Sequence, residues 1–259
     1  MYKIKMLLLL AASGVCSIGM AEMRTWHFKT GESIEAEYVM TVMDKYRIKD
    51  ANGKEYTIPI AQFDLSADDK EYLALENPPE LEMEIRKSIV RKNYTMIRGS
   101  EDRPPEQRGN FGVFIKQKSP ADYPYPLTVE VFAFGDEIKG DRIILLDRFS
   151  SPFSLKDKNR SKFEFYSNRT VRLTDMWDAP FAGLYCFSRR GEQYFGFMIV
   201  VKDKRGKVIA VEASNDWMPE HLETLEERRI GNYMDKTFQR TYPTRPKHDW
   251  SALQQLKNY

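Results

Sequence analysis

The sequence predicts a mainly β protein: a small β-barrel or meander near the N-terminus, then an antiparallel β-sandwich, then a short C-terminal helix and a tail. Three observations support this fold class. Most apolar residues between Trp26 and Ile60 fall on even positions, short strand-like runs recur over residues 81–213, and no long amphipathic helix separates those runs. With 42% hydrophobic and 13% aromatic residues, the chain is well supplied for packed cores.

The first module is predicted from the alternation of its side chains. Successive side chains of a strand face opposite sides, so an apolar set confined to even positions gives each short strand one buried face. Gly31 and the Asn52-Gly53 pair mark turns between the strands. Ser66, with Asp69 three residues later, marks the start of a capped helix. The apolar even positions are Trp26, Phe28, Ile34, Ala36, Tyr38, Met40, Val42, Tyr46, Ile48, Tyr56, Ile58 and Ile60.

Residues 1–21 are typical of a signal peptide. Lys3 and Lys5 precede an apolar run over residues 6–12, and the small residues Gly19 and Ala21 mark a cleavage site after Ala21. A membrane span is the weaker interpretation, because the apolar run is shorter than the roughly 20 residues that a bilayer needs. A lipoprotein anchor at Cys16 is a minor alternative. We therefore expect an exported protein, periplasmic or secreted, whose mature chain has no membrane span.

Charge and motifs exclude several classes of function. The chain carries 40 Lys+Arg and 38 Asp+Glu, and cleavage at Ala21 leaves 38 of each. This balance does not favour nucleic-acid binding, which needs a concentrated basic face. The three histidines are isolated, and we find no metal-binding spacing, nucleophile elbow or phosphate-binding loop. We therefore expect no catalytic residues, no metal and no cofactor, and a protein that is not an enzyme.

Several segments of the first module resemble a known family over residues 24–73. They are Arg24-Thr25-Trp26, the Gly31 turn, Ile34-Glu35-Ala36-Glu37-Tyr38, residues 50–55, Thr57-Ile58-Pro59-Ile60, and Leu65-Ser66 with Asp69 and Tyr72. In this order they resemble SLA1 homology domain 1 (SHD1). The resemblance implies an SH3-like barrel. In eukaryotic endocytic adaptors such a domain binds Asn-Pro-Phe-x-Asp peptides and cytoskeletal partners, so the resemblance also implies a peptide- or protein-binding role.

Two aromatic residues of this module are candidates for peptide binding. Trp26 and Tyr46 have large amphipathic rings, which contribute much of the contact when a peptide lies in a shallow groove. Both are at even positions, so the alternative interpretation is that they fill the barrel core.

The second module follows a proline-rich boundary. Pro78 and Pro79 end the helix and predict a linker over residues 76–80, between a first domain at 22–75 and a second at 81–218. The second domain is predicted to be an antiparallel β-sandwich of immunoglobulin-like or jelly-roll type. Its predicted strands are residues 81–90, 111–116, 127–134, 142–146, 162–165, 170–173, 183–187, 194–201 and 208–213.

Two predicted loops of the sandwich give the alternative function. Tyr123 and Tyr125 lie on a proline-stiffened stretch, and Trp177 lies between Asp175 and Asp178. Sugar rings stack on aromatic faces while carboxylates accept hydrogen bonds from hydroxyl groups. These residues favour, as the alternative to protein binding, a secreted carbohydrate-binding or glycan-processing protein. The partner is otherwise a protein or peptide that the sequence does not identify.

The C-terminal region is predicted to be a helix and then a tail. Residues 219–230 open with Pro219 and acidic residues and close with Arg228 and Arg229, the charge order that a helix dipole favours. Residues 231–259 are largely polar, and we expect much of this tail to be disordered.

Overall fold

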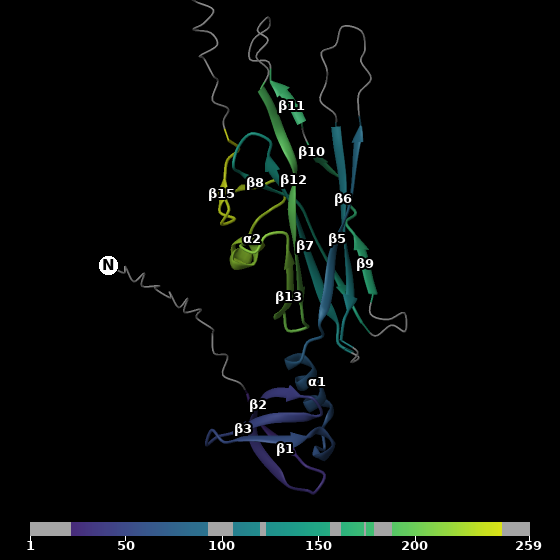
Figure 1. The fold of residues 1–259 in the computed structure, drawn as a ribbon, viewed down its shortest axis with the longest axis vertical. Helices are drawn as coiled ribbons and strands as arrows, with labels where there is room; N and C mark the ends of the chain where they lie inside the picture. The colour runs from purple at the N-terminus through teal and green to yellow at the C-terminus, as the bar shows by residue number, and fades with distance from the viewer. Residues whose placement is uncertain are drawn as a thin grey trace, which may run out of the picture. The chain divides into compact units, whose positions relative to one another are not determined.

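The structure is a computed structural model that describes residues 22–92, 106–119, 123–155, 162–173, 175–178 and 188–244. The predicted signal peptide, the predicted strand over residues 183–187 and the end of the tail lie outside these ranges. The chain divides into two compact units, Met1–Asn77 and Pro78–Tyr259, which we call the N-terminal unit and the C-terminal unit. Antiparallel sheets dominate both units (Figure 1), so the predicted mainly β fold is confirmed.

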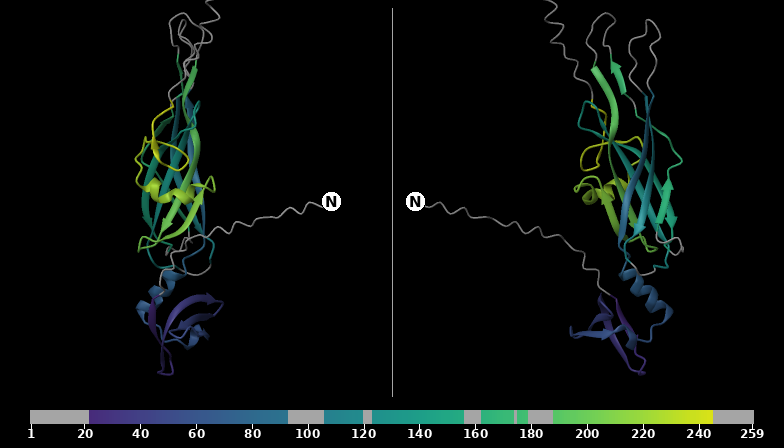
Figure 2. Two further views of the ribbon diagram at one scale, coloured as in Figure 1. Left: turned by 90° about the vertical axis from the view of Figure 1, so that its left-hand side faces the viewer. Right: turned by 45° about the vertical axis from the view of Figure 1, so that its right-hand side comes forward.

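The N-terminal unit is a meander of four strands. The strands pair antiparallel in chain order and are followed by a 3₁₀ turn and one α-helix. Figure 2 shows that the sheet curls instead of lying flat. The elements are β1 (Met23–His27), β2 (Ser33–Val42), β3 (Lys45–Asp50), β4 (Glu55–Pro59), η1 (Ile60–Gln62) and α1 (Ala67–Glu76).

The segment after η1 closes the curled sheet onto β1. Phe28 and Phe63 form an antiparallel bridge. The amide of Lys29 donates a hydrogen bond to the carbonyl of Gln62 over 2.9 Å, and the amide of Asp64 donates to the carbonyl of His27 over 2.8 Å. These bonds give the far edge of β1 a partner beyond β2, as a barrel requires.

The even-numbered core is confirmed for most of the module. Trp26, Ala36 and Ile48 are completely buried, and Phe63 and Leu73 join the same core. The pattern fails at one place in β2. The pairing of β2 with β3 slips between Tyr38 and Met40, and the extra residue turns Met40 away from the core, where its side chain is 45% exposed.

Helix α1 begins with the predicted capping box. The amide of Asp69 donates to Ser66 Oγ, and the amide of Ser66 donates to Asp69 Oδ2, each over 3.1 Å. Two unpaired amides at the helix start are therefore satisfied by side chains. Leu73 and Leu75 are the buried apolar residues of the helix.

The C-terminal unit contains two antiparallel sheets. The first has four strands in the order β10-β6-β5, with β9 also paired to β6. The second has seven strands in the order β11-β12-β7-β8-β14-β15, with β13 also paired to β12. The strands are β5 (Leu81–Lys92), β6 (Glu106–Gln117), β7 (Leu127–Glu137), β8 (Ile143–Phe153), β9 (Lys162–Tyr166), β10 (Val171–Leu173), β11 (Asp175–Asp178), β12 (Ser188–Lys202), β13 (Val208–Ala213), β14 (Tyr233–Met234) and β15 (Arg240–Thr241).

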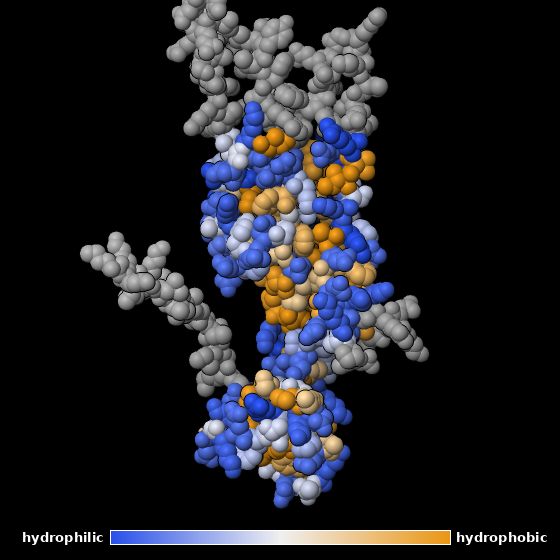
Figure 3. Space-filling model, in the orientation of Figure 1, coloured by the Kyte–Doolittle hydropathy of each residue, from blue (hydrophilic) through white to orange (hydrophobic). Residues whose placement is uncertain are grey.

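Apolar side chains from both sheets pack against each other, which confirms the predicted sandwich. The shared core contains Phe111 of β6, Ala133 and Leu146 of β7 and β8, and Val171 and Leu173 of β10. Strand β7 is buried along most of its length because its second face is covered too. Figure 3 shows hydrophobic residues at the surface of this unit as well; exposed ones include Ile89, Val90 and Val208.

The C-terminal segment covers the other face of the seven-stranded sheet. Figures 1 and 2 show it on the side of that sheet away from β5 and β6. It contains η2 (Met218–His221) and α2 (Leu222–Glu226), so the helix is shorter than the predicted residues 219–230. The expected disorder is wrong for residues 231–244: Met234 and Phe238 are completely buried, and the Phe238 ring stacks on Phe134 with centroids 5.2 Å apart.

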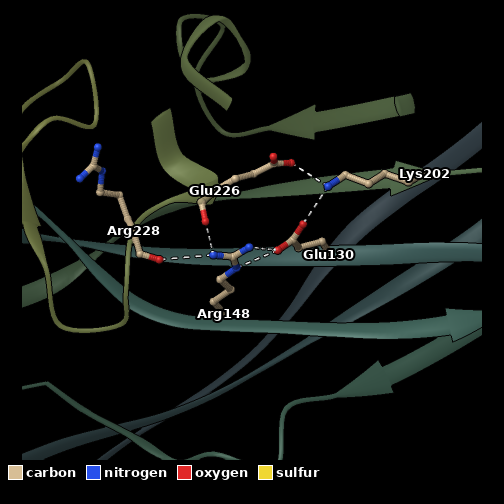
Figure 4. A network of polar contacts seen from close by, with 5 residues as sticks. All are labelled: Glu130, Arg148, Lys202, Glu226 and Arg228. Carbon is tan, nitrogen blue, oxygen red and sulfur yellow. Dashed lines mark hydrogen bonds and ion pairs between the residues drawn. The ribbon is translucent and has the colours of Figure 1, made fainter. Parts of the chain in front are cut away.

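A network of charged side chains joins α2 to three strands of this sheet (Figure 4). Arg148 Nε donates to Glu130 Oε1 over 2.7 Å, and Arg148 Nη1 donates to the carbonyls of Glu226 and Arg228 over 2.6 and 3.3 Å. Lys202 Nζ lies 3.2 Å from Glu130 Oε2 and 2.7 Å from Glu226 Oε1. The guanidinium therefore bonds the sheet and the end of the helix at the same time.

Among the helices of the described residues, none is long and apolar enough to cross a membrane.

Candidate functional site

The N-terminal unit has a groove of about 450 Å³ between two short segments. The β1–β2 turn forms one wall, and the end of β4 with η1 forms the other. A volume of this size is in the range of ligand-binding clefts. The groove is lined by Phe28, Lys29, Thr30, Glu32, Ile58, Ala61 and Gln62.

Backbone hydrogen bonds hold the turn and join the walls. The amide of Phe28 donates to the carbonyl of Glu32, and the amide of Gly31 donates to the carbonyl of Phe28, each over 2.9 Å. Gly31 has φ +89°, a conformation that residues with a Cβ rarely adopt. The bond from Lys29 to Gln62 then fixes the turn against η1. Backbone hydrogen bonds within the turn and between the two walls therefore fix the shape of the groove.

The floor of the groove is continuous with the core. The Phe28 ring lies 5.1 Å from the ring of Phe63, which in turn meets Trp26 edge-on at 6.0 Å. Lys29 and Glu32 are exposed at the rim. The groove therefore combines an apolar floor, which suits an apolar side chain of a ligand, with charged groups that can contact polar parts of it.

The prediction that Trp26 anchors a peptide is wrong. Its side chain is completely buried, and its indole N–H donates to the carbonyl of Ala36 over 2.9 Å. Tyr46 is half-buried against Phe63 and Tyr38, at ring distances of 5.4 and 5.9 Å, and burial raises its pKa above the usual value. Neither residue lines the groove. The alternative interpretation, that even-numbered aromatic residues fill the barrel, holds for Trp26.

Sequence reasoning assigned Phe28 to the core and did not single it out for binding. The available signal was its place, an apolar residue at the last even position before the Gly31 turn. A side chain at a strand end next to a turn can be reached from outside, whereas one in mid-strand is covered by its neighbours. Phe28 accordingly packs on the core and also lines the groove.

The predicted sugar-binding residues of the sandwich do not form an open aromatic platform at Tyr123. Its side chain is only 3% exposed, and its hydroxyl group has no hydrogen-bond partner among the residues that the structure describes. The ring meets Tyr125 edge-on at 5.7 Å, and Lys204 Nζ lies 5.4 Å from the centre of the Tyr125 ring. The prediction for Tyr123 is wrong because the tyrosine packs into the unit instead of facing solvent.

The second predicted sugar-binding stretch is a strand and not a loop. Asp175–Asp178 forms β11, which pairs antiparallel with residues 188–191 of β12. The side chains of Asp175, Trp177 and Asp178 lie outside the described part of the structure.

No group of three or more His, Cys, Asp or Glu residues that could hold a metal ion is present in the ranges that the structure describes.

Comparison with known proteins identifies the unit that carries the groove. No curated protein and no solved structure gives a significant match to the chain. Residues 18–78 match the family model of SLA1 homology domain 1, SHD1, so this segment is similar to a protein-binding type of domain.

Proposed function

We propose that this protein is exported and binds a protein or peptide partner through the groove of its SHD1 domain, without catalysing a reaction. The observation that carries the proposal is that the matched domain, residues 18–78, contains a formed groove with an apolar floor. In this proposal an apolar side chain of the partner enters over Phe28 and Ile58, and polar groups of the partner meet Lys29 and Glu32 at the rim.

The proposed ligand is a short extended segment. The groove lies beside the ends of β1 and β4, and its rim offers both a cation and an anion. A peptide presents alternate side chains on opposite sides, so one apolar side chain can enter while its neighbours stay at the rim. An Asn-Pro-Phe-x-Asp peptide, the ligand type of SHD1 domains in endocytic adaptors, is the first probe.

Export is proposed from residues 1–21, whose charged start, apolar run and small residues before the expected cleavage site are those of a signal peptide. Expression of the full chain in a Gram-negative host, followed by N-terminal sequencing of the periplasmic protein, tests this. We expect the mature chain to start at Glu22. Retention of the full-length chain in the cytoplasm would contradict export.

The groove is tested by blocking it. Ala61 is exposed and lines the groove, so Ala61→Arg places a long charged side chain in the opening without removing a core residue. With residues 22–259 and a fluorescent Asn-Pro-Phe-x-Asp peptide, we expect at least about tenfold weaker binding, corresponding to roughly 1.4 kcal/mol.

Ala51→Arg is the matched control. Ala51 is also an exposed alanine of the same domain, but it lies in the turn between β3 and β4 and does not line the groove. We expect its affinity to equal that of the unchanged chain. Equal binding by the Ala61→Arg and unchanged chains would place the ligand elsewhere, and no binding by the unchanged chain would exclude this peptide as the ligand.

A further inference from the structure

Strand β5 has one edge that is open to another strand. It is the last strand in the order β10-β6-β5, and no strand of the described residues pairs with its other edge, which we call the free edge (Figure 1). None of the side chains described in β5 is buried. Met83 and Ile85 lie opposite Ile115 and Val113 of β6, which are completely buried, so they face the core but are only partly covered. The core of the sandwich is therefore accessible along this edge.

The pairing with β6 determines which backbone groups point to the free edge. The amide of Lys118 donates to the carbonyl of Glu80 over 2.8 Å, at the pair that precedes Leu81 and Gln117. In an antiparallel ladder, hydrogen-bonded pairs alternate with pairs that have no such bonds. The even-numbered residues of β5 therefore bond to β6, and the odd-numbered residues direct their amides and carbonyls to the free edge. These groups are the ones that a further strand would use.

The charges of β5 are ordered from acidic to basic along the strand. Glu82 and Glu84 lie in its first half. Arg86, Lys87 and Arg91 follow in its second half. A second copy of β5 that runs antiparallel brings its basic half to this acidic half, whereas a parallel copy would align acid with acid. The free edge is therefore complementary to itself, as the interface of a two-fold dimer must be.

One register of that pairing avoids opposing like charges. With the two-fold axis at Ile85, Glu84 lies opposite the partner's Arg86 on the outer face, and the two copies of Ile85 meet on the inner face. Leu81 then meets the partner's Ile89, whose side chain is 36% exposed in the single chain. Moving the axis by one residue would oppose two copies of Glu84 or two copies of Arg86. The charges therefore select the register centred on Ile85.

Lys87 is compatible with this pairing, although a charged residue on the inner face often protects an edge strand. Its Nζ lies 4.3 Å from the centre of the ring of Tyr194, which belongs to β12 of the other sheet. The ammonium group is therefore directed toward that sheet. In the register centred on Ile85, Lys87 lies opposite the partner's uncharged Met83.

We propose that β5 pairs antiparallel with β5 of a second copy of this chain, about a two-fold axis at Ile85, to give a homodimer. The four-stranded sheets of the two copies then form one continuous sheet, and the inner-face residues of the two β5 strands cover one another. Because the interface is centred on a single strand pair, we expect a weak dimer with a micromolar dissociation constant. The dimer does not depend on the groove of the N-terminal unit, so either can exist without the other.

The test is the molar mass of residues 22–259, measured by sedimentation over a range of micromolar concentrations. We expect the mass to rise with concentration to that of two chains and no further, because a two-fold interface is closed. Amide hydrogen exchange at the odd positions Met83, Ile85 and Lys87 should slow as the dimer forms. Exchange at Glu84 and Arg86 should not change, because these amides already bond to β6.

Lys87→Pro removes one amide from the free edge. Since the amide of this odd-numbered residue does not bond to β6, the single chain should keep its fold. The second strand loses a hydrogen bond and meets the proline ring, so dimerisation should weaken at least about tenfold. Lys87→Ala is the matched control, because it removes the same side chain and keeps the amide, and it should dimerise like the unchanged chain. Circular dichroism melting curves verify that each variant is folded.

Arg86→Glu tests the register and leaves the backbone unchanged. It places two acidic side chains opposite each other at both ends of the central pair, so dimerisation should weaken about tenfold. Combining it with Glu84→Arg exchanges the two charges and should restore most of the affinity. The proposal is overturned if the unchanged chain stays monomeric or forms larger oligomers. Equal dimerisation by Lys87→Pro and Lys87→Ala, or by Arg86→Glu and the double variant, would overturn it as well.

Discussion

Replacing Arg148 by alanine should destabilise the C-terminal unit by about 2–4 kcal/mol. Removing one partner of a buried ion pair typically costs about 3–5 kcal/mol, because the other charge stays buried without its partner. Here the group that loses its partner is Glu130, whose side chain is 11% exposed; within the described residues it would keep the ion pair with Lys202. The side chain of Arg148 is itself 31% exposed, so water screens part of the interaction and lowers the expected cost.

The change should also loosen α2. Arg148 donates to the carbonyls of Glu226 and Arg228, and both would lose this donor. Urea unfolding of residues 22–259 measures the stability. With a slope of about 2 kcal/mol per molar urea, the midpoint of the C-terminal unit should fall by roughly 1–2 M. Hydrogen–deuterium exchange of Leu222–Glu226 should become faster in the variant.

Two further variants test the role of the Arg148 network. Arg229→Ala is the matched control, because Arg229 is an exposed arginine next to Arg228 in the chain. This variant should change the free energy of unfolding by less than about 0.5 kcal/mol. The double variant Glu130→Leu, Arg148→Met removes both charges and should recover most of the loss, because no unpaired charge is left. If Arg148→Ala were no less stable than Arg229→Ala, the network would not hold the helix to the sheet.

Two other predictions concern a strained turn and a buried phenol. Met43 has φ +55° and is 94% exposed, so Met43→Gly should relieve backbone strain and stabilise the N-terminal unit by about 0.5–1 kcal/mol; an unchanged or lower melting temperature would contradict this. Burial raises the pKa of Tyr194 from 10.0 to about 12, so the unfolded chain loses this proton at lower pH than the folded one. Stability present below pH 10 should therefore decline as the pH rises from 10 to 12, and the decline in urea midpoint should be less steep in Tyr194→Phe; parallel declines would show that Tyr194 does not contribute.

The N-terminal unit was largely predictable because its signals are local. The capping box needs only Ser66 and Asp69, three residues apart, and the even-numbered core follows from the geometry of a single strand. The prediction failed at Met40 because one extra residue in β2 reverses the faces of those after it. Such an irregularity depends on the pairing between two strands, which alternation along one strand does not show.

The C-terminal unit shows the same limit on a larger scale. The strand positions were visible as apolar runs, but their partners were not: β6 pairs with β5 along its whole length and also with β9 and β10, which lie far along the chain. The polar composition after residue 230 suggested disorder. The structure buries Phe238 against Phe134 because Phe134 belongs to a hydrophobic face of the sheet that the C-terminal segment covers. Phe134 lies more than ninety residues earlier in the chain.

The sequence by itself determined the mainly β class, the capped helix and the SHD1 resemblance, since each depends on residues close together in the chain. Only the tertiary structure decided where a ligand could bind. The groove exists because Phe63 comes back to pair with Phe28. This pairing between distant segments is set by long-range packing and not by the pattern within either segment.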